Sequence, residues 1–325
     1  MSQTDDFYLD YAGSSLYTTE QLEAVFEDLA RLRLGNTHSR NQRGKLCAAL
    51  VNAARQRVLA HFNATSVDYE VVFTRNATGA LQLVADCFDF GSADSRKLRQ
   101  HEPAGAATNL LQTDLEKLDE CGPTFAYFSD NHTSVVGMRE VVPAGVGVAC
   151  VRSQEVESFL RANSVAPSSL SEERAIGGSS LFAYPAQSNF SGRYYPLAWI
   201  EELRRRLDAL GRTKWFILLD AAAFVATSPL DLSVHIADFV VVSFYKMFGY
   251  PTGLGALLVR KIAAADRLLA SRRRRYFGGG SVQAVVPDLD FCVRKMTLAD
   301  SLECGTIDFL GVVALKQGFA TLERS

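Results

Sequence analysis

Residues 239–253 read Phe-Val-Val-Val-Ser-Phe-Tyr-Lys-Met-Phe-Gly-Tyr-Pro-Thr-Gly. The apolar, β-branched run from Phe239 predicts a buried strand, with Ser243 and Lys246 at its end, and a second apolar strand is predicted over 255–259. A lysine at the mouth of a buried sheet is unusual, because its ammonium group is costly to desolvate. One interpretation is catalytic, since a partly buried lysine loses its proton readily and reacts with carbonyl groups. The other is an exposed lysine whose stem covers apolar surface.

The composition is that of an ordinary globular chain. It has 325 residues, 48% of them hydrophobic, and a formal net charge of -2. This charge gives no reason to expect nucleic acid or a membrane surface as a partner, and no apolar run is long enough to cross a bilayer. The six cysteines contain no CxxC pair, which argues against a zinc site and a disulfide framework, and the polar N-terminus is unlike a signal peptide. We therefore expect a cytoplasmic protein without a metal site.

Strand and helix patterns alternate along the chain. Strands are predicted over 69–74, 125–128, 146–151, 179–184, 215–219, 236–244 and 255–259, and helices over 19–34, 45–61, 77–88, 154–162, 197–210 and 307–322, with a further helical stretch opened by His132. This order predicts an α/β fold with a mostly parallel seven-stranded sheet flanked by helices. Two polar segments, 91–123 and 163–178, are interpreted as surface insertions, and the basic run 272–275 as a solvated helix end.

Polar residues follow several of these strands, where an open parallel sheet binds its ligands. Ala77 and Thr78 open a helix whose free backbone N–H groups suit a phosphate, although Thr78 can equally be a helix cap. His132 is either a stacking partner for an aromatic ligand or a polar residue at a helix start. Asn189 either donates to a ligand oxygen or stabilises its own turn. Asp220 ends a wholly apolar strand, so its carboxylate needs a buried cationic or N–H partner.

One ligand accounts for these residues together with Ser243 and Lys246. Pyridoxal 5'-phosphate has a phosphate, an aromatic ring, a phenolic oxygen, a ring nitrogen and an aldehyde. In this interpretation Asp220 keeps the ring nitrogen protonated, while Lys246 binds the aldehyde and later moves the Cα proton of the substrate. A nicotinamide-dependent dehydrogenase is the other common interpretation of an α/β chain, but no G-x-G-x-x-G follows the first strand. The sequence therefore predicts a pyridoxal phosphate enzyme with Lys246, His132 and Asp220 as its catalytic residues.

Longer motifs match a known family. They are Tyr8–Gly13, Asn131–Arg139, Tyr184–Gly192, Leu219–Ala222, Thr227–Leu232, Ser243–Gly253, Phe277–Gly280 and Gly305–Ile307. With these motifs the chain resembles the class V aminotransferases of fold type I, which include the cysteine desulfurases. Within that family it is most similar to the N-terminal module of molybdenum cofactor sulfurases. The resemblance runs from about Phe7 to the end and implies one cofactor-binding domain over 1–325, the large domain of this fold.

The resemblance implies a role for each residue that would touch the cofactor. By the family's pattern Lys246 is the cofactor lysine, Asp220 the partner of the pyridine nitrogen and His132 the residue that stacks on the ring. Asn189 is expected to bond the phenolic oxygen.

Further roles concern the phosphate, the partner subunit and the substrate. The family's pattern makes Thr78 and Ser243 phosphate ligands, beside Ala77 at the helix start, and Thr306 the residue that reaches the phosphate of the other subunit in a homodimer. The segment 35–40 resembles the active-site loop that closes over the substrate, with Asn36, His38 and Arg40 as its polar residues.

The resemblance also implies an activity and its partners. A sulfurase of this kind takes sulfur from L-cysteine, leaves alanine, and carries the sulfur as a persulfide on its own cysteine. It then passes the sulfur to the molybdenum centre of xanthine dehydrogenase and aldehyde oxidase. The small subdomain that brings the persulfide cysteine, and the domain that binds the molybdenum cofactor, are expected beyond Ser325, so the chain is expected to be truncated. Ala223 and Tyr245 depart from related desulfurases, which often have Gln and His there.

Two alternatives remain open from the sequence. One keeps pyridoxal phosphate and changes the substrate, as in a selenocysteine lyase or another Cβ-lyase of the same class. The other is a truncated, non-catalytic module that binds pyridoxal phosphate.

Overall fold

The computed structural model of the chain describes residues 7–91, 110–111, 115, 118, 122–162, 178–210, 213–261, 268 and 276–324. The basic run at 272–275 and most of the two predicted insertions lie outside these residues, so those predictions are not tested. Within the described part, no helix combines the length and the apolar character needed to cross a membrane.

The order of elements follows the predicted alternation from β1 onward. The helices are α1 (Thr19–Leu32), α2 (Gln42–His61), α3 (Ala77–Cys87), α4 (Thr133–Val136), α5 (Ser153–Arg161), α6 (Trp199–Asp208), α7 (Phe244–Phe248), α9 (Leu298–Leu302) and α10 (Phe309–Leu322), with 3-10 turns η2 (Gly137–Val141) and η4 (Phe224–Ala226). The strands are β1 (Tyr69–Thr74), β2 (Leu110–Leu111), β3 (Thr124–Phe128), β4 (Gly147–Val151), β5 (Ser179–Pro185), β6 (Lys214–Asp220), β7 (Phe239–Ser243), β8 (Gly255–Arg260), β9 (Val282–Val286) and β10 (Phe291–Arg294).

The described strands β1 to β8 form one sheet in the order β1-β8-β7-β6-β5-β3-β4-β2. Strands β7, β6, β5, β3, β4 and β2 run parallel, and β8 is antiparallel to both of its neighbours, β1 and β7. Strand β1 therefore points the same way as β7. The carboxyl ends of β1, β3, β5, β6 and β7 all meet at one edge of the sheet.

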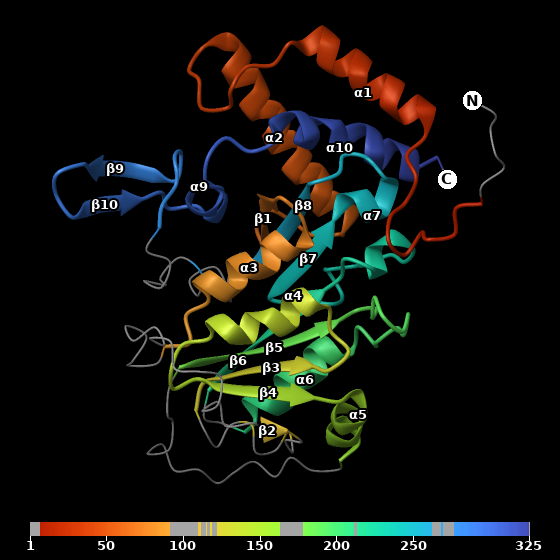
Figure 1. The fold of residues 1–325 in the computed structure, drawn as a ribbon, viewed down its shortest axis with the longest axis vertical. Coiled ribbons are helices and arrows are strands. Elements are labelled where there is room, and N and C mark those ends of the chain that lie inside the picture. Colours follow the sequence, from red (N-terminus) through yellow and green to blue (C-terminus); the bar gives the residue numbers. More distant parts are fainter. Residues whose placement is uncertain are drawn as a thin grey trace.

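Helices cover both faces of this sheet (Figure 1). All residues of β3, β5 and β7 are buried, which explains their apolar runs Phe125–Phe128, Leu181–Tyr184 and Phe239–Val242. One core cluster joins the sheet to α2, α6 and α10, and a second joins the other face to α3 and the segment after it. The predicted α/β fold with a mostly parallel sheet is confirmed.

Several local predictions need correction. The seven predicted strands are present, but the two-residue strand β2 adds an eighth, and Leu115 and Leu118 in the same predicted surface insertion are buried. Strand β7 ends at Ser243, and Lys246, which was predicted at the end of this strand, lies in the one-turn helix α7 that follows it. A two-residue strand carries too little pattern to recognise, because its existence depends on pairing with β4.

The hairpin of β9 and β10, which projects away from the sheet (Figure 1), was not predicted. Its residues are exposed or half-buried on both faces, so the alternation typical of a half-buried strand is missing. The local signal was weak: three valines at 282–286, then Pro287 and Asp288, which favour a turn, and a short run at 291–294 with one further valine.

Candidate active site

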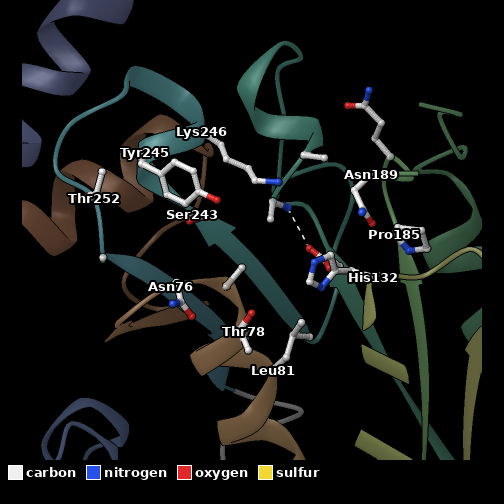
Figure 2. A pocket seen from close by; sticks show the side chains of 16 residues that line it. Asn76, Thr78, Leu81, His132, Pro185, Asn189, Ser243, Tyr245, Lys246 and Thr252 are labelled. Atoms are coloured by element: carbon white, nitrogen blue, oxygen red, sulfur yellow. Dashed lines mark hydrogen bonds between the residues drawn. The ribbon is translucent and has the colours of Figure 1, made fainter. Parts of the chain in front are cut away.

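A cavity of about 340 Å³ lies at the edge where the strands end. Seven of the eight predicted cofactor-binding residues line it, namely Ala77, Thr78, His132, Asn189, Asp220, Ser243 and Lys246. They lie at the carboxyl ends of five different strands or in the segments that follow them, so the parallel arrangement is what brings them together. Figure 2 shows Lys246 reaching into this space from one side, with His132 opposite and Thr78 below them.

The first turn of α3 and the end of β7 form the part of the cavity that suits a phosphate. Asn76 caps α3 by accepting from the N–H of Gly79 at 2.8 Å, and the N-terminus of this 11-residue helix carries a partial positive charge. Nearby, Ser243 Oγ is buried and has no hydrogen-bond partner among the described residues. A buried hydroxyl without a partner is costly, and a ligand oxygen in the cavity would remove that cost. The residues present therefore fit the phosphate of the predicted cofactor.

A close backbone contact fixes the position of α3. Gly255 begins β8, and a Cβ atom there would lie 2.7 Å from the carbonyl carbon of Asn76 and 2.7 Å from the carbonyl oxygen of Val242. Only glycine allows β8 to approach the start of α3 and the end of β7 so closely.

Asp220 is the buried carboxylate of the site. It ends β6, is 8% exposed, and accepts a hydrogen bond from the N–H of Ala222 at 3.1 Å. Burial raises the pKa of Asp220, and the nearby His132 and Lys246 oppose this shift. A buried carboxylate with a raised pKa is typical of a group that awaits a cationic partner, and a protonated pyridine nitrogen would supply one.

We expect Asp220→Asn to stabilise the cofactor-free protein at pH 7. Ionised Asp220 costs the folded state free energy, because burial raises its pKa above the ordinary value of 3.8. The cost is absent below pH 3.8, where both states bind the proton, grows as the pH rises from there to the folded pKa, and is constant above it. Thermal unfolding of both proteins without cofactor should thus show a stability difference that shrinks toward zero near pH 4. A wild-type protein that is more stable than the variant at pH 7 would contradict the expectation.

Asp130 holds together the two segments that carry His132 and Asn189. It accepts hydrogen bonds from Ser191 Oγ at 2.9 Å and from the hydroxyl of Tyr195 at 2.8 Å. Burial, followed by this hydrogen bond, raises the pKa of Tyr195 to about 12, so the phenol stays protonated and continues to donate. The turn with Asn189 is thereby tied to the end of β3.

The N-terminal segment holds the helix that carries Lys246. Ser15 Oγ donates to the carbonyl oxygen of Lys246 at 2.7 Å, and buried Gln21 donates through Nε2 to the carbonyl of Tyr250 at 2.9 Å. Gly249 ends α7 with φ at +77°, and a side chain there would collide with the backbone of Tyr17. These contacts fix the backbone at Lys246. Its side chain is half-buried, and its amine reaches the cavity.

Four predicted site residues are not among the described residues that line the cavity: Thr306, Asn36, His38 and Arg40. Asn36 donates from Nδ2 to Thr306 Oγ1 at 3.2 Å, and His38 lies against Gly280. Thr306 lines a different cavity along α3, of about 590 Å³, and Arg40 is exposed. The structure thus joins the predicted substrate loop to Thr306 and separates both from Lys246.

The cavity also contains residues that sequence reasoning left out. Asn76, Gln187 and Thr252 line it, and Gln187 Oε1 is buried with no partner among the described residues. Each of them lies within a few residues of a predicted site residue, so position after a strand end was an available signal.

Relatives of known name match nearly the whole chain. The family model for "Aminotransferase class-V" matches residues 7–100 and 167–325. Molybdenum cofactor sulfurase of Bos taurus is 46% identical over 320 residues, which are 98% of this chain and 33% of that protein. The Homo sapiens protein of the same name is 45% identical over 327 residues, 98% of this chain and 32% of that protein. The chain therefore spans about a third of the length of these relatives.

Solved structures share the fold. A cysteine desulfurase from Thermococcus onnurineus NA1 superposes with a TM-score of 0.68 at 20% identity, covering 98% of this chain and 67% of that one. The cystine C-S lyase C-DES, solved with cysteine persulfide, gives a TM-score of 0.67 at 16% identity, covering 98% of this chain and 72% of that one. At such identities the likeness concerns the fold alone. The family model, which matches most of the chain, goes further, and it shows that this chain belongs to the class V aminotransferase family.

Proposed function

We propose that the chain binds pyridoxal 5'-phosphate and takes sulfur from L-cysteine, leaving alanine, as the N-terminal part of a molybdenum cofactor sulfurase. The observation that carries this proposal is the convergence of Lys246, Asp220 and His132 on one cavity, beside the start of α3. The Ser243 hydroxyl, which has no hydrogen-bond partner in the described part of the chain, lies at the same place. The name of the relatives that match 98% of the chain, molybdenum cofactor sulfurase, supports sulfur transfer, and the name of a structural neighbour, cysteine desulfurase, supports cysteine as the source of the sulfur.

Each predicted cofactor-binding residue in the cavity has a role in this proposal. The ring of pyridoxal phosphate, when bound, accepts electrons from the substrate Cα. Asp220 holds a proton on the ring nitrogen, His132 stacks on the ring, and Asn189 bonds its oxygen. Lys246 binds the aldehyde carbon and moves a proton at Cα.

The phosphate is held by the other end of the cavity. The hydroxyls of Thr78 and Ser243 donate to it, and the backbone at Ala77 adds the positive end of α3. The fit of these groups supports pyridoxal phosphate over pyridoxal, which has no phosphate to satisfy Ser243.

The partner subunit and the acceptors extend the proposal. We infer a homodimer in which Thr306, held by Asn36, reaches the phosphate in the partner's site, and in which the loop with His38 and Arg40 covers substrate. The separation of Thr306 from the Lys246 cavity within one chain supports this arrangement. Residues 1–325 form the large domain, and xanthine dehydrogenase and aldehyde oxidase in the cytoplasm receive the sulfur.

The test uses the purified chain with pyridoxal phosphate. We expect the visible absorbance of lysine-bound cofactor and, with L-cysteine and a thiol reductant, formation of alanine in the amount of sulfide released. Cofactor absorbance without alanine formation would overturn catalysis by this chain and favour the non-catalytic module. Faster alanine formation from selenocysteine than from cysteine would favour a selenocysteine lyase, and failure to bind the cofactor would overturn the whole proposal.

A further inference from the structure

A chain of hydrogen bonds runs from the first turn of α3 to the ring of His132. Thr78 Oγ1 and Ser134 Oγ lie 2.8 Å apart, and Ser134 Oγ lies 3.0 Å from His132 Nδ1. The backbone N–H of Ser134 also donates to His132 Nδ1, with a distance of 3.1 Å. Ser134 is half-buried and sits between two residues of the cavity without lining the cavity itself.

The backbone contact decides which ring nitrogen carries the proton. An amide N–H is always a donor, so the Nδ1 atom that it faces must be an acceptor. Neutral imidazole carries one hydrogen, which must then be on Nε2. This geometry also makes His132 the N-cap of α4, where its ring replaces the usual Ser or Asp oxygen.

The Ser134 hydroxyl has only one hydrogen to give, and it has two acceptors within reach. It can donate to His132 Nδ1, or it can donate to Thr78 Oγ1. A phosphate dianion beside Thr78 accepts hydrogen bonds and donates none, so Thr78 must turn its own hydrogen toward the phosphate. Thr78 then becomes an acceptor for Ser134, and His132 Nδ1 loses the hydroxyl donor and keeps only the backbone one.

We propose that Ser134 is a positioning residue with two effects on His132. Its backbone N–H keeps the proton of His132 on Nε2, and its hydroxyl stops donating to Nδ1 when a phosphate binds beside Thr78. The identity of the phosphate ligand rests on the proposed function, whereas the proton position rests on the hydrogen bonds of the chain alone. His132 can therefore donate a hydrogen bond into the cavity through Nε2, the nitrogen that Ser134 does not contact.

The experiment is nitrogen NMR of the chain labelled with ¹⁵N-histidine. The chain has five histidines, and the His132 signals are identified by their loss in His132→Gln. Without ligand, we expect the chemical shifts of Nε2–H and unprotonated Nδ1 for His132. The ligand arm compares pyridoxal with pyridoxal phosphate, both in sulfate-free buffer, since the two ligands differ only in the phosphate. The phosphate should move the Nδ1 signal toward the value of an imidazole nitrogen that has lost a hydrogen bond.

Matched variants separate the hydroxyl from general effects. Ser134→Ala should lose most of the phosphate-dependent displacement of Nδ1 while keeping the Nε2–H form, and Ser134→Thr should restore the displacement. Ser233→Ala is the control, because it removes a serine hydroxyl that bonds Asp231 at 2.6 Å and is not among the described residues of the cavity. If Ser134→Ala does not fold, Thr78→Val at saturating cofactor interrupts the same chain from its other end.

Two results would overturn the inference. One is a proton on Nδ1 of wild-type His132. The other is an equal phosphate-dependent displacement in wild type and Ser134→Ala. Absence of lysine-bound cofactor absorbance in wild type would instead refute the proposed function, and the ligand-free measurement of the proton position would still stand.

Discussion

Replacing Lys246 with alanine is expected to abolish the absorbance of lysine-bound cofactor and to lower any turnover of L-cysteine by at least about 10²–10⁴-fold, the range for loss of a positioned proton-transfer group. The reason is that Lys246 is the cavity's amine, presented from a helix that Ser15 and Gln21 hold in place. Truncation at Cβ leaves that backbone arrangement intact. The measurement is the visible spectrum after addition of pyridoxal phosphate, followed by an assay for alanine.

Lys246→Arg is the matched control for charge. The guanidinium keeps a positive charge near Asp220 and does not lose its proton, so it cannot attack the aldehyde. We expect the arginine variant to bind pyridoxal phosphate without the lysine-bound absorbance and to be as inactive as the alanine variant. Full absorbance or full turnover in either variant would refute the assignment of Lys246.

The second large effect is expected from Gly255→Ala. The added Cβ would meet backbone atoms of Asn76 and Val242 at 2.7 Å, and neither can move without shifting α3 or β7. We expect a loss of about 1–3 kcal/mol in the free energy of unfolding, as for other overpacked sites. The start of α3 would also shift, so the affinity for pyridoxal phosphate should fall more than that for pyridoxal. Denaturant titration and cofactor titration measure the two effects.

Gly137→Ala provides the control for replacing a glycine. No atom of the residues that the structure describes lies within 4 Å of a Cβ atom at Gly137, and as the C-cap of α4 it has φ at -64°. Its replacement should leave the free energy of unfolding and the cofactor affinity unchanged, or stabilise slightly by reducing the freedom of the unfolded chain. An effect of Gly255→Ala no larger than that of Gly137→Ala would contradict the role given to the close contact.

The predicted architecture rested on patterns that are local in the chain. Strands such as β5 and β7 were recognisable because both of their faces are buried, which demands an unbroken apolar run. The hairpin of β9 and β10 lacks a buried face, and β2 is two residues long, so neither imposes such a pattern. Lys246 was expected at the end of a strand, whereas the chain turns into α7 directly after Ser243.

The candidate site was likewise predictable from the sequence only in part. Asp220 and His132 were found because each follows a strand end, and the parallel sheet gathers strand ends at one edge. The family resemblance already assigned Thr306 to the site of the other subunit, but its hydrogen bond with Asn36 was not visible, since it depends on how the loop with Asn36 packs. Ser134 also stayed hidden, because its significance lies in distances to Thr78 and His132.

By itself, the sequence determined the order of the elements, the side chains at the strand ends and the family to which they point. These features follow from hydrophobic periodicity and residue chemistry, which act over a few neighbouring positions. Only the tertiary structure decided that Ser243 is buried with no hydrogen-bond partner among the residues described, that Gly255 touches Asn76, and that Ser15 holds Lys246. Those contacts join residues far apart in the chain, and their distances are set by the packing of whole helices against the sheet.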